Sequence, residues 1–271
     1  MASLVLFHNT YRCTGPQGDD AADLVLLHGW GLHSIVWDDV MPSLLKYFRV
    51  TVIDLPGMGQ SPMPAGDYTL DYMVEHVHAV LPPRCHLMGW SLGGLVALRL
   101  ATQYPQQVLS LTLVAATPKF VAVENWPGVD SQLLDRFMQV FDEDVEGTLI
   151  RFLALNCKDA LTVRDDVRKL KEILYFCGLP APRALRGGLE VLRDTDLRNE
   201  LTELKQPLLL LFGQQDNIVP AAVAEKLSSS HPVSVLAGVS HVPFVSRPDA
   251  FIQQLTEGWQ KIGVLLAGES A

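Results

Sequence analysis

Long apolar runs are missing from this chain, and their absence excludes several classes of protein at once. No run of apolar residues approaches membrane-spanning length, so we expect no membrane partner. Residues 1–8 contain no basic residue, and their only apolar run is four residues long, which is not the pattern of a signal peptide. We therefore expect a soluble protein that is not exported.

Cysteine and basic charge are also scarce. The four cysteines, Cys13, Cys85, Cys157 and Cys177, are scattered and form no Cys-x-x-Cys pair, which predicts reduced thiols in the cytoplasm instead of disulfides. A net charge of -9 argues against nucleic acid as a partner. We find no cluster with metal-ligand spacing and no phosphate-binding loop, so we expect no metal and no cofactor, and a monomer.

The 271 residues do contain a regular alternation of short apolar runs and helical patterns. The predicted strands are residues 24–27, 50–53, 85–88, 111–114, 208–212 and 233–236. The predicted helices beside them are residues 68–80, 92–104, 221–227 and 250–262, with a further helix near Trp37 and Leu44. This alternation predicts an α/β fold, with a mostly parallel central sheet flanked by helices.

The alternation stops between residues 118 and 193, where no comparable strand pattern occurs. Four helical patterns replace it, at residues 133–141, 148–155, 163–176 and 184–192. We interpret residues 118–193 as a helical cap. It is inserted into a core formed by residues 1–117 and 194–271.

The most informative stretch is the Gly-x-Ser-x-Gly pattern centred on Ser91. It lies between the strand at 85–88 and the helix at 92–104, which is the context of a nucleophile elbow. The chain must reverse sharply at the serine, and side chains at Gly89 and Gly93 would collide across that turn. We therefore predict that Ser91 is an exposed nucleophile at the carboxyl edge of the sheet.

A nucleophilic serine needs a base, and the base needs an orienting acid. In a fold of this kind the acid and the histidine follow the serine in the chain. Asp216 stands in the loop after the strand at 208–212, and His241 stands in the loop after the strand at 233–236. Other histidines precede the serine or lie on a helix or at the opposite edge of the sheet. We predict a Ser91–His241–Asp216 triad.

The negative charge of a tetrahedral intermediate requires backbone N–H donors that already point at it. We expect one from Leu92, directly after the nucleophile. We expect the other from Trp30, because Gly29 and Gly31 on either side of it let the backbone come close to the site. Four further side chains, on or near the catalytic loops and in the cap, are predicted to line an apolar acyl channel: Leu32, Trp90, Trp126 and Phe152.

These motifs together resemble the α/β-hydrolase superfamily over nearly the whole chain. They are His-Gly-Trp-Gly at 28–31, Asp-Leu-Pro-Gly-x-Gly-x-Ser at 54–61, Gly-Trp-Ser-Leu-Gly-Gly at 89–94 and the two loops above. The cap sequences Trp-Pro-Gly at 126–128, Arg-Phe-Leu-Ala-Leu at 151–155 and Gly-Gly-Leu-Glu at 187–190 look like those of the pimeloyl-[acyl-carrier protein] methyl ester esterases of biotin synthesis.

The resemblance implies a serine carboxylesterase that cleaves the methyl ester of a pimeloyl chain on acyl carrier protein. Two other functions stay open. One is an enzyme of the same fold acting on another ester or on a C–C bond, because fold does not fix function. The other is a non-catalytic ligand-binding protein, which the intact set of serine, histidine and aspartate argues against.

Charge patterning in the cap agrees with a carrier-protein partner. Residues 147–193 hold nine basic and five acidic residues in a chain that is otherwise acidic. In the esterases that the chain resembles, cap arginines bind the carrier, and Arg151, Arg164 and Arg168 match them; Gly147 stands where that family has a further basic residue. Arg164 and Arg168 are four residues apart and share a helix face. A basic face would attract an acidic carrier.

Overall fold

A computed structural model describes residues 4–141 and 143–264 of the chain. Its centre is a seven-stranded sheet with the order β1-β3-β2-β4-β5-β6-β7. The strands are β1 (His8–Tyr11), β2 (Asp23–Leu27), β3 (Arg49–Ile53), β4 (Cys85–Trp90), β5 (Val108–Val114), β6 (Leu208–Gly213) and β7 (Val233–Leu236). Six strands run parallel, and β1 alone is antiparallel to its neighbour β3.

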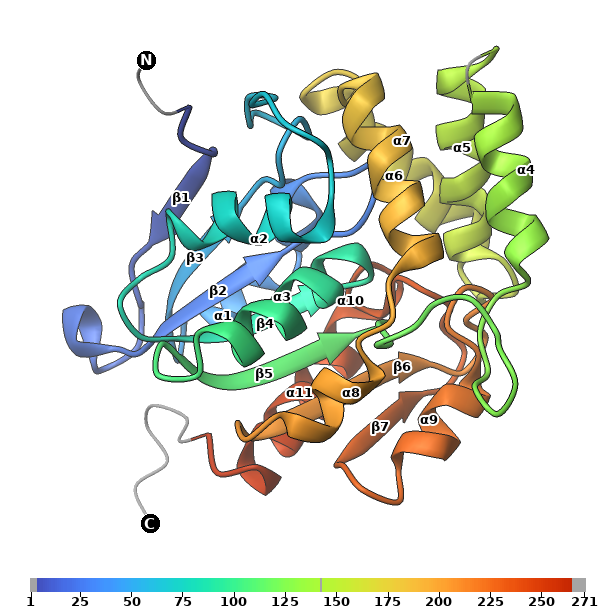
Figure 1. The fold of residues 1–271 in the computed structure, drawn as a ribbon. Helices are drawn as coiled ribbons and strands as arrows, with labels where there is room; N and C mark the ends of the chain where they lie inside the picture. Colours follow the sequence, from blue (N-terminus) through green and yellow to red (C-terminus); the bar gives the residue numbers. More distant parts are fainter. Residues whose placement is uncertain (1–3, 142, 265–271) are drawn as a thin grey trace.

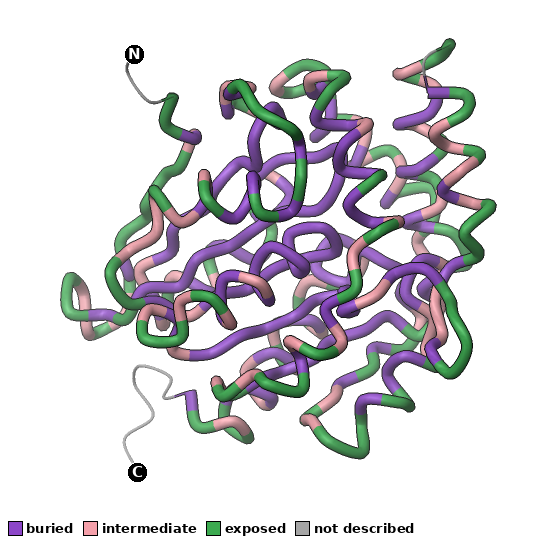
Figure 2. Tube along the Cα trace, in the orientation of Figure 1, coloured by how far each residue is buried: buried purple, intermediate pink, exposed green. Residues whose placement is uncertain are grey.

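The central strands form because both of their faces are covered. Every residue of β2 and β6 is buried, as expected of parallel strands with helices on both sides of the sheet. Figure 2 shows the sheet as the buried interior of the molecule. The α/β fold predicted from the alternation of apolar runs and helices is confirmed.

Helices cover the sheet on both faces (Figure 1). Those outside residues 118–193 are α1 (Met41–Leu44), α2 (Leu70–His78), α3 (Leu92–Gln103), α8 (Arg198–Glu203), α9 (Ala221–Leu227), α10 (Pro243–Ser246) and α11 (Pro248–Lys261). Helix α3 packs on β4 and β5, and α11 packs on β6 and β7. One polar contact in this core joins helix to sheet: the indole N–H of Trp259 donates to Oγ1 of Thr112 at 2.9 Å.

Four helices follow β5 and lie beyond the carboxyl ends of the strands (Figure 1). They are α4 (Ser131–Phe141), α5 (Val145–Cys157), α6 (Val163–Phe176) and α7 (Pro182–Asp194). We call residues 118–193 the helical insert. The chain enters and leaves it at one place, because the Leu197 N–H donates to the carbonyl of Pro118 at 2.8 Å.

Two sequence predictions need correction. The segment near Trp37 and Leu44 does not form one helix: it forms a 3₁₀ turn, Ser34–Trp37, and the single-turn helix α1. Strand β1 was not predicted, because all four of its residues are exposed and polar or aromatic, with no apolar alternation.

In the described part of the chain, no helix combines the length and apolar character needed to cross a membrane.

Candidate active site

Ser91 lies in the sharp turn between β4 and α3. Its backbone dihedrals, φ 53° and ψ -119°, are outside the usual region for a residue with a side chain. The neighbouring glycines are needed for this turn. A Cβ at Gly89 would lie 2.4 Å from the carbonyl oxygen of Gly93, and a Cβ at Gly93 would lie 2.4 Å from that of His28. The predicted elbow geometry is therefore present.

Ser91, His241 and Asp216 are joined by hydrogen bonds. Nε2 of His241 lies 2.8 Å from Oγ of Ser91, and Nδ1 lies 2.8 Å from Oδ2 of Asp216. A carboxylate only accepts, so the imidazole proton belongs on Nδ1 and Nε2 is free to accept the serine hydroxyl proton. All three residues are buried, with Ser91 only 2% exposed.

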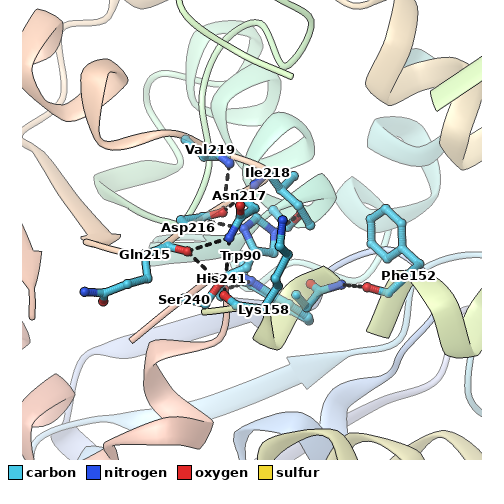
Figure 3. Close-up of polar contacts among 12 residues, drawn as sticks. Trp90, Phe152, Lys158, Gln215, Asp216, Asn217, Ile218, Val219, Ser240 and His241 are labelled. Carbon is cyan, nitrogen blue, oxygen red and sulfur yellow. Dashed lines mark hydrogen bonds and ion pairs between the residues drawn. The ribbon is translucent and has the colours of Figure 1, made fainter. Parts of the chain in front are cut away.

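The loops that carry the acid and the histidine brace each other. The Gln215 N–H donates to the carbonyl of Val239 at 3.0 Å, and Oγ of Ser240 donates to the carbonyl of Gln215 at 3.1 Å. Figure 3 shows Gln215, Ser240 and His241 close together, with Asp216 beside them. Gly213 permits the approach, because a Cβ there would lie 2.0 Å from the carbonyl oxygen of Ser240. The indole N–H of Trp90 donates to the carbonyl of His241 at 2.8 Å.

The backbone N–H groups of Trp30 and Leu92, predicted as oxyanion donors, have no protein acceptor within residues 4–141 and 143–264. Leu92 opens α3, where the first N–H groups of a helix have no intrahelical partner. Trp30 is fixed in place by its side chain, whose indole N–H donates to the carbonyl of Leu185 in α7 at 2.7 Å. Gly31, next to Trp30, has φ +75°.

His28 holds the loop that precedes Trp30, a contribution that the sequence did not reveal. Its Nδ1 lies 2.8 Å from the carbonyl of Gly29, and its Nε2 accepts the Leu55 N–H at 2.8 Å. Burial lowers the pKa of His28 to about 4, so the ring is neutral near pH 7. The available signal was a histidine directly after a buried strand and directly before the Gly29-Trp30 pair.

The four residues predicted to line an acyl channel all lie in the buried hydrophobic cluster of the molecule. Phe152 packs edge-on against Trp30, with ring centroids 4.6 Å apart, and Leu32 is fully buried in the same apolar cluster. Trp90 lies against the ring of His241 at 5.7 Å. Trp126 is buried in the same cluster; its indole N–H donates to the carbonyl of Lys119 at 3.0 Å, and the cationic groups of Arg198 and Lys226 each lie 5.8 Å from its ring centroid. The assignment of all four residues to an acyl channel stays a prediction.

The three arginines predicted to bind a carrier lie on the two adjacent insert helices α5 and α6. Arg151 pairs with Asp144 at 3.2 Å, and Arg168 pairs with Asp165 at 3.0 Å, both with largely exposed side chains. Asp144 also explains Gly147, because a Cβ at Gly147 would lie 1.9 Å from Oδ2 of Asp144. A groove of about 550 Å³ lies between α4 and α5, lined by Arg151 and by no residue of the triad.

The described residues hold no candidate metal site. The described ranges, 4–141 and 143–264, contain no group of three or more His, Cys, Asp or Glu residues that could hold a metal ion. All four cysteines are free thiols, three of them buried. Burial raises the pKa of the Cys85 thiol to about 12, so that this group is not a nucleophile near pH 7.

A parallel sheet, a serine on a strained strand–helix turn and a histidine–aspartate pair behind it define the α/β-hydrolase class. The model of the alpha/beta hydrolase family matches residues 24–254, and the chain belongs to this family. Within it, the chain groups with the pimeloyl-[acyl-carrier protein] methyl ester esterases. It is 44% identical to that of Aeromonas hydrophila over 236 residues, which cover 85% of this chain and 92% of the relative.

Other comparisons agree. The chain is 42% identical to the pimeloyl-[acyl-carrier protein] methyl ester esterase of Pectobacterium atrosepticum over 246 residues, covering 88% of this chain and 94% of the relative. Among solved structures, a thermophilic esterase from Thermogutta terrifontis superposes with a TM-score of 0.78 at 22% identity, covering 95% of this chain and 93% of that one. At that identity the structural likeness supports the fold alone.

Proposed function

We propose that this protein is a serine carboxylesterase that hydrolyses the methyl ester of a pimeloyl chain carried on acyl carrier protein, a reaction of biotin synthesis. The observation that carries the proposal is the 44% identity to an esterase of that name across 92% of the relative's length. The hydrogen-bonded chain of Ser91, His241 and Asp216 supplies the chemistry that an esterase needs.

The proposed reaction starts when Oγ of Ser91 attacks the ester carbonyl while Nε2 of His241 takes the hydroxyl proton. Asp216 stabilises the imidazolium that forms. The N–H groups of Trp30 and Leu92, which lack protein acceptors, are the donors we assign to the oxyanion. The imidazolium then protonates the departing methoxide. Methanol leaves, and a water molecule activated by His241 hydrolyses the acyl-enzyme to the free carboxylate.

We assign the acyl chain to an apolar channel between the sheet and the helical insert, lined by Leu32, Trp90, Trp126 and Phe152. In this proposal residues 118–193 are a cap subdomain, and residues 1–117 and 194–271 are the catalytic core. The free cysteines support a reducing, cytoplasmic location. The carrier would dock on the insert, where Arg151, Arg164 and Arg168 offer positive charge to an acidic partner.

The test is a panel of methyl esters of dicarboxylic acids, each supplied free and on acyl carrier protein, with methanol release as the measurement. The proposal expects kcat/KM to be highest for the carrier-bound pimeloyl ester. Equal or greater activity on free esters of other lengths would instead indicate a general esterase. Tight ligand binding without turnover would indicate a receptor on the same scaffold.

A further inference from the structure

The turn that joins α5 and α6 reaches from the helical insert to both catalytic loops. We define the α5–α6 turn as residues 156–166, which include the last residues of α5 and the first of α6. Its contacts run to the loop of the acid, at Asn217, and to the loop of the base, at Gly238, His241 and Ser246. These contacts are hydrogen bonds between segments more than fifty residues apart in the chain.

The turn fixes the backbone of the catalytic base directly. The His241 N–H donates to the carbonyl of Asn156 at 3.0 Å, while the His241 carbonyl accepts the indole N–H of Trp90 at 2.8 Å. The same histidine is therefore held by the insert on one side and by the core on the other. Where the loop begins, the Leu161 N–H donates to the carbonyl of Gly238 at 3.1 Å.

Asp166 fixes the far end of the same loop through a side chain. Its Oδ2 accepts Oγ of Ser246 at 2.6 Å and Oγ1 of Thr162 at 2.8 Å. Ser246 ends α10, the helix that begins two residues after His241. Asp166 is buried, and no basic side chain pairs with it in residues 4–141 and 143–264.

A buried carboxylate without a cationic partner is costly to desolvate, and burial raises the pKa of Asp166 accordingly. Asp166 fixes the orientation of two side chains, because the hydroxyl groups of Thr162 and Ser246 must both point at its Oδ2 atom. The arrangement therefore fits a role in placing α10 and the loop that carries His241.

Asn217, one residue after Asp216, connects the loop of the acid to the α5–α6 turn by hydrogen bonds. Its amide nitrogen lies 2.9 Å from the carbonyl oxygen of Gln215, 3.1 Å from Oδ2 of Asp159 and 3.3 Å from the carbonyl oxygen of Lys158. Figure 3 shows Asn217 between the acid loop and Lys158. Asp159 adopts φ +65°, an uncommon conformation that presents its carboxylate to Asn217.

We propose that the α5–α6 turn positions the catalytic base and acid, with Asp166 acting through Ser246 on His241 and Asn217 acting on Asp216. This inference rests on the proposed esterase function. The imidazole must keep 2.8 Å contacts to Ser91 and Asp216 at once. A displacement of about 1 Å in such a constellation costs about a hundredfold in rate. Asp166 and Asn217 are positioning residues, because neither touches the reacting atoms.

The test compares Asp166→Ala, Ser246→Ala and Asn217→Ala with wild type on a short p-nitrophenyl ester. Each is expected to lower kcat by about tenfold or more and to leave KM within about twofold, because the loss lies in alignment and not in substrate binding. The pH profile of kcat should shift, since the contact between His241 and Asp216 is altered. Asp166→Asn should recover most of the activity, because the amide oxygen can accept both hydroxyl groups.

Glu172→Ala is the matched control, because it removes an exposed carboxylate from the same helix, α6, and should leave kcat unchanged. The thermal unfolding temperature of every variant is measured as well, so that a loss of kcat caused by unfolding can be told from one caused by misalignment of His241. If Asp166→Ala and Ser246→Ala lower the unfolding temperature but leave kcat and its pH profile unchanged, the tie is only structural and the inference is overturned.

A second readout keeps the inference separate from the proposed function. In the wild type, the Nδ1 proton of His241 should give a downfield NMR signal from its hydrogen bond to Asp216. That signal should weaken or shift in Asp166→Ala and Ser246→Ala and stay in Glu172→Ala, whether or not any ester is cleaved. An inactive wild type would overturn the esterase proposal, and an unchanged signal in all variants would overturn the positioning role.

Discussion

The two oxygen atoms of Asp216 have different partners: Oδ2 lies 2.8 Å from Nδ1 of His241, and Oδ1 accepts the N–H groups of Ile218 and Val219, each at 2.8 Å. The backbone donors therefore decide which atom faces the imidazole.

This arrangement predicts the effect of Asp216→Asn. The two N–H donors will keep the amide oxygen, so the amide nitrogen must face Nδ1 of His241 and donate to it. The imidazole proton then moves to Nε2, which can no longer accept from Ser91. We expect kcat to fall by about 10⁴-fold with the fold intact, measured by ester hydrolysis and by thermal unfolding. Comparable losses in Asp194→Asn, whose carboxylate pairs with Arg193, would contradict the assignment.

Ser91→Ala tests the nucleophile itself. Removing Oγ removes the atom that would form the acyl-enzyme, so turnover should fall by about three orders of magnitude or more. The strained backbone at position 91 stays, so the variant should fold. A serine-directed phosphonate should label the wild type at Ser91 and should not label the variant, as read by mass spectrometry. Labelling at another serine would redirect the search for the nucleophile.

Phe152→Leu tests the acyl channel. Phe152 packs between Trp30, with ring centroids 4.6 Å apart, and Phe137, at 5.5 Å. If this surface holds the chain, wild-type kcat/KM should rise about fourfold for each added methylene, the equivalent of about 0.8 kcal/mol of burial. The smaller side chain should flatten that rise. A wild type with equal kcat/KM across ester lengths would remove the basis for a channel here.

The double substitution Arg164→Glu/Arg168→Glu tests carrier docking. Reversing two exposed charges on α6 should raise KM for the carrier-bound ester, most at low salt, because screening weakens the attraction at high salt. Hydrolysis of a small free ester should not change. Arg12→Glu/Arg84→Glu, at exposed arginines outside the insert, is the matched control and should bind the carrier normally. Equal losses on both substrates would mean damage to the insert.

His28 makes stability depend on pH. Its folded pKa of about 4 lies below the ordinary value of 6.5, so the unfolded chain binds more protons and stability falls as pH drops from 7 toward 4. Between pH 7.5 and 5 this histidine should remove about 2 kcal/mol from the free energy of unfolding. Urea unfolding at both pH values measures the change. His28→Asn should be less stable at pH 7.5 and should show a smaller decrease. Equal decreases would assign the effect to other groups.

The sequence predicted the buried strands and the loops that bring Ser91, Asp216 and His241 together, because both leave local signals. The apolar run at 208–212 became β6, and the helix predicted at 163–176 is α6 with the same bounds. Strand β1 left no such signal, because its pairing with β3 comes from backbone groups and not from side-chain pattern. Helix bounds elsewhere differ by up to three residues, as at α5, because caps such as Asp144 fix them.

Contacts between distant segments were the part that could not be predicted. The indole N–H of Trp126 donates to the carbonyl of Lys119, a contact that no pattern in the sequence indicates. Asn156 meets His241 through a backbone carbonyl, which any residue type provides, so no side-chain pattern marks it. His28 was visible as a histidine near the site. Its hydrogen bond to the Leu55 N–H joins the loops that follow β2 and β3. Only the fold brings these two loops together.

The two-sided hold on the His241 peptide limits how this scaffold could be recombined. A chimaera that exchanged residues 118–193 for an unrelated helical segment would keep Trp90 but lose the carbonyl of Asn156. The histidine would then keep one of its two backbone anchors. The insert therefore cannot be exchanged without removing a backbone contact of His241. A replacement segment must therefore supply a backbone carbonyl that accepts the His241 N–H.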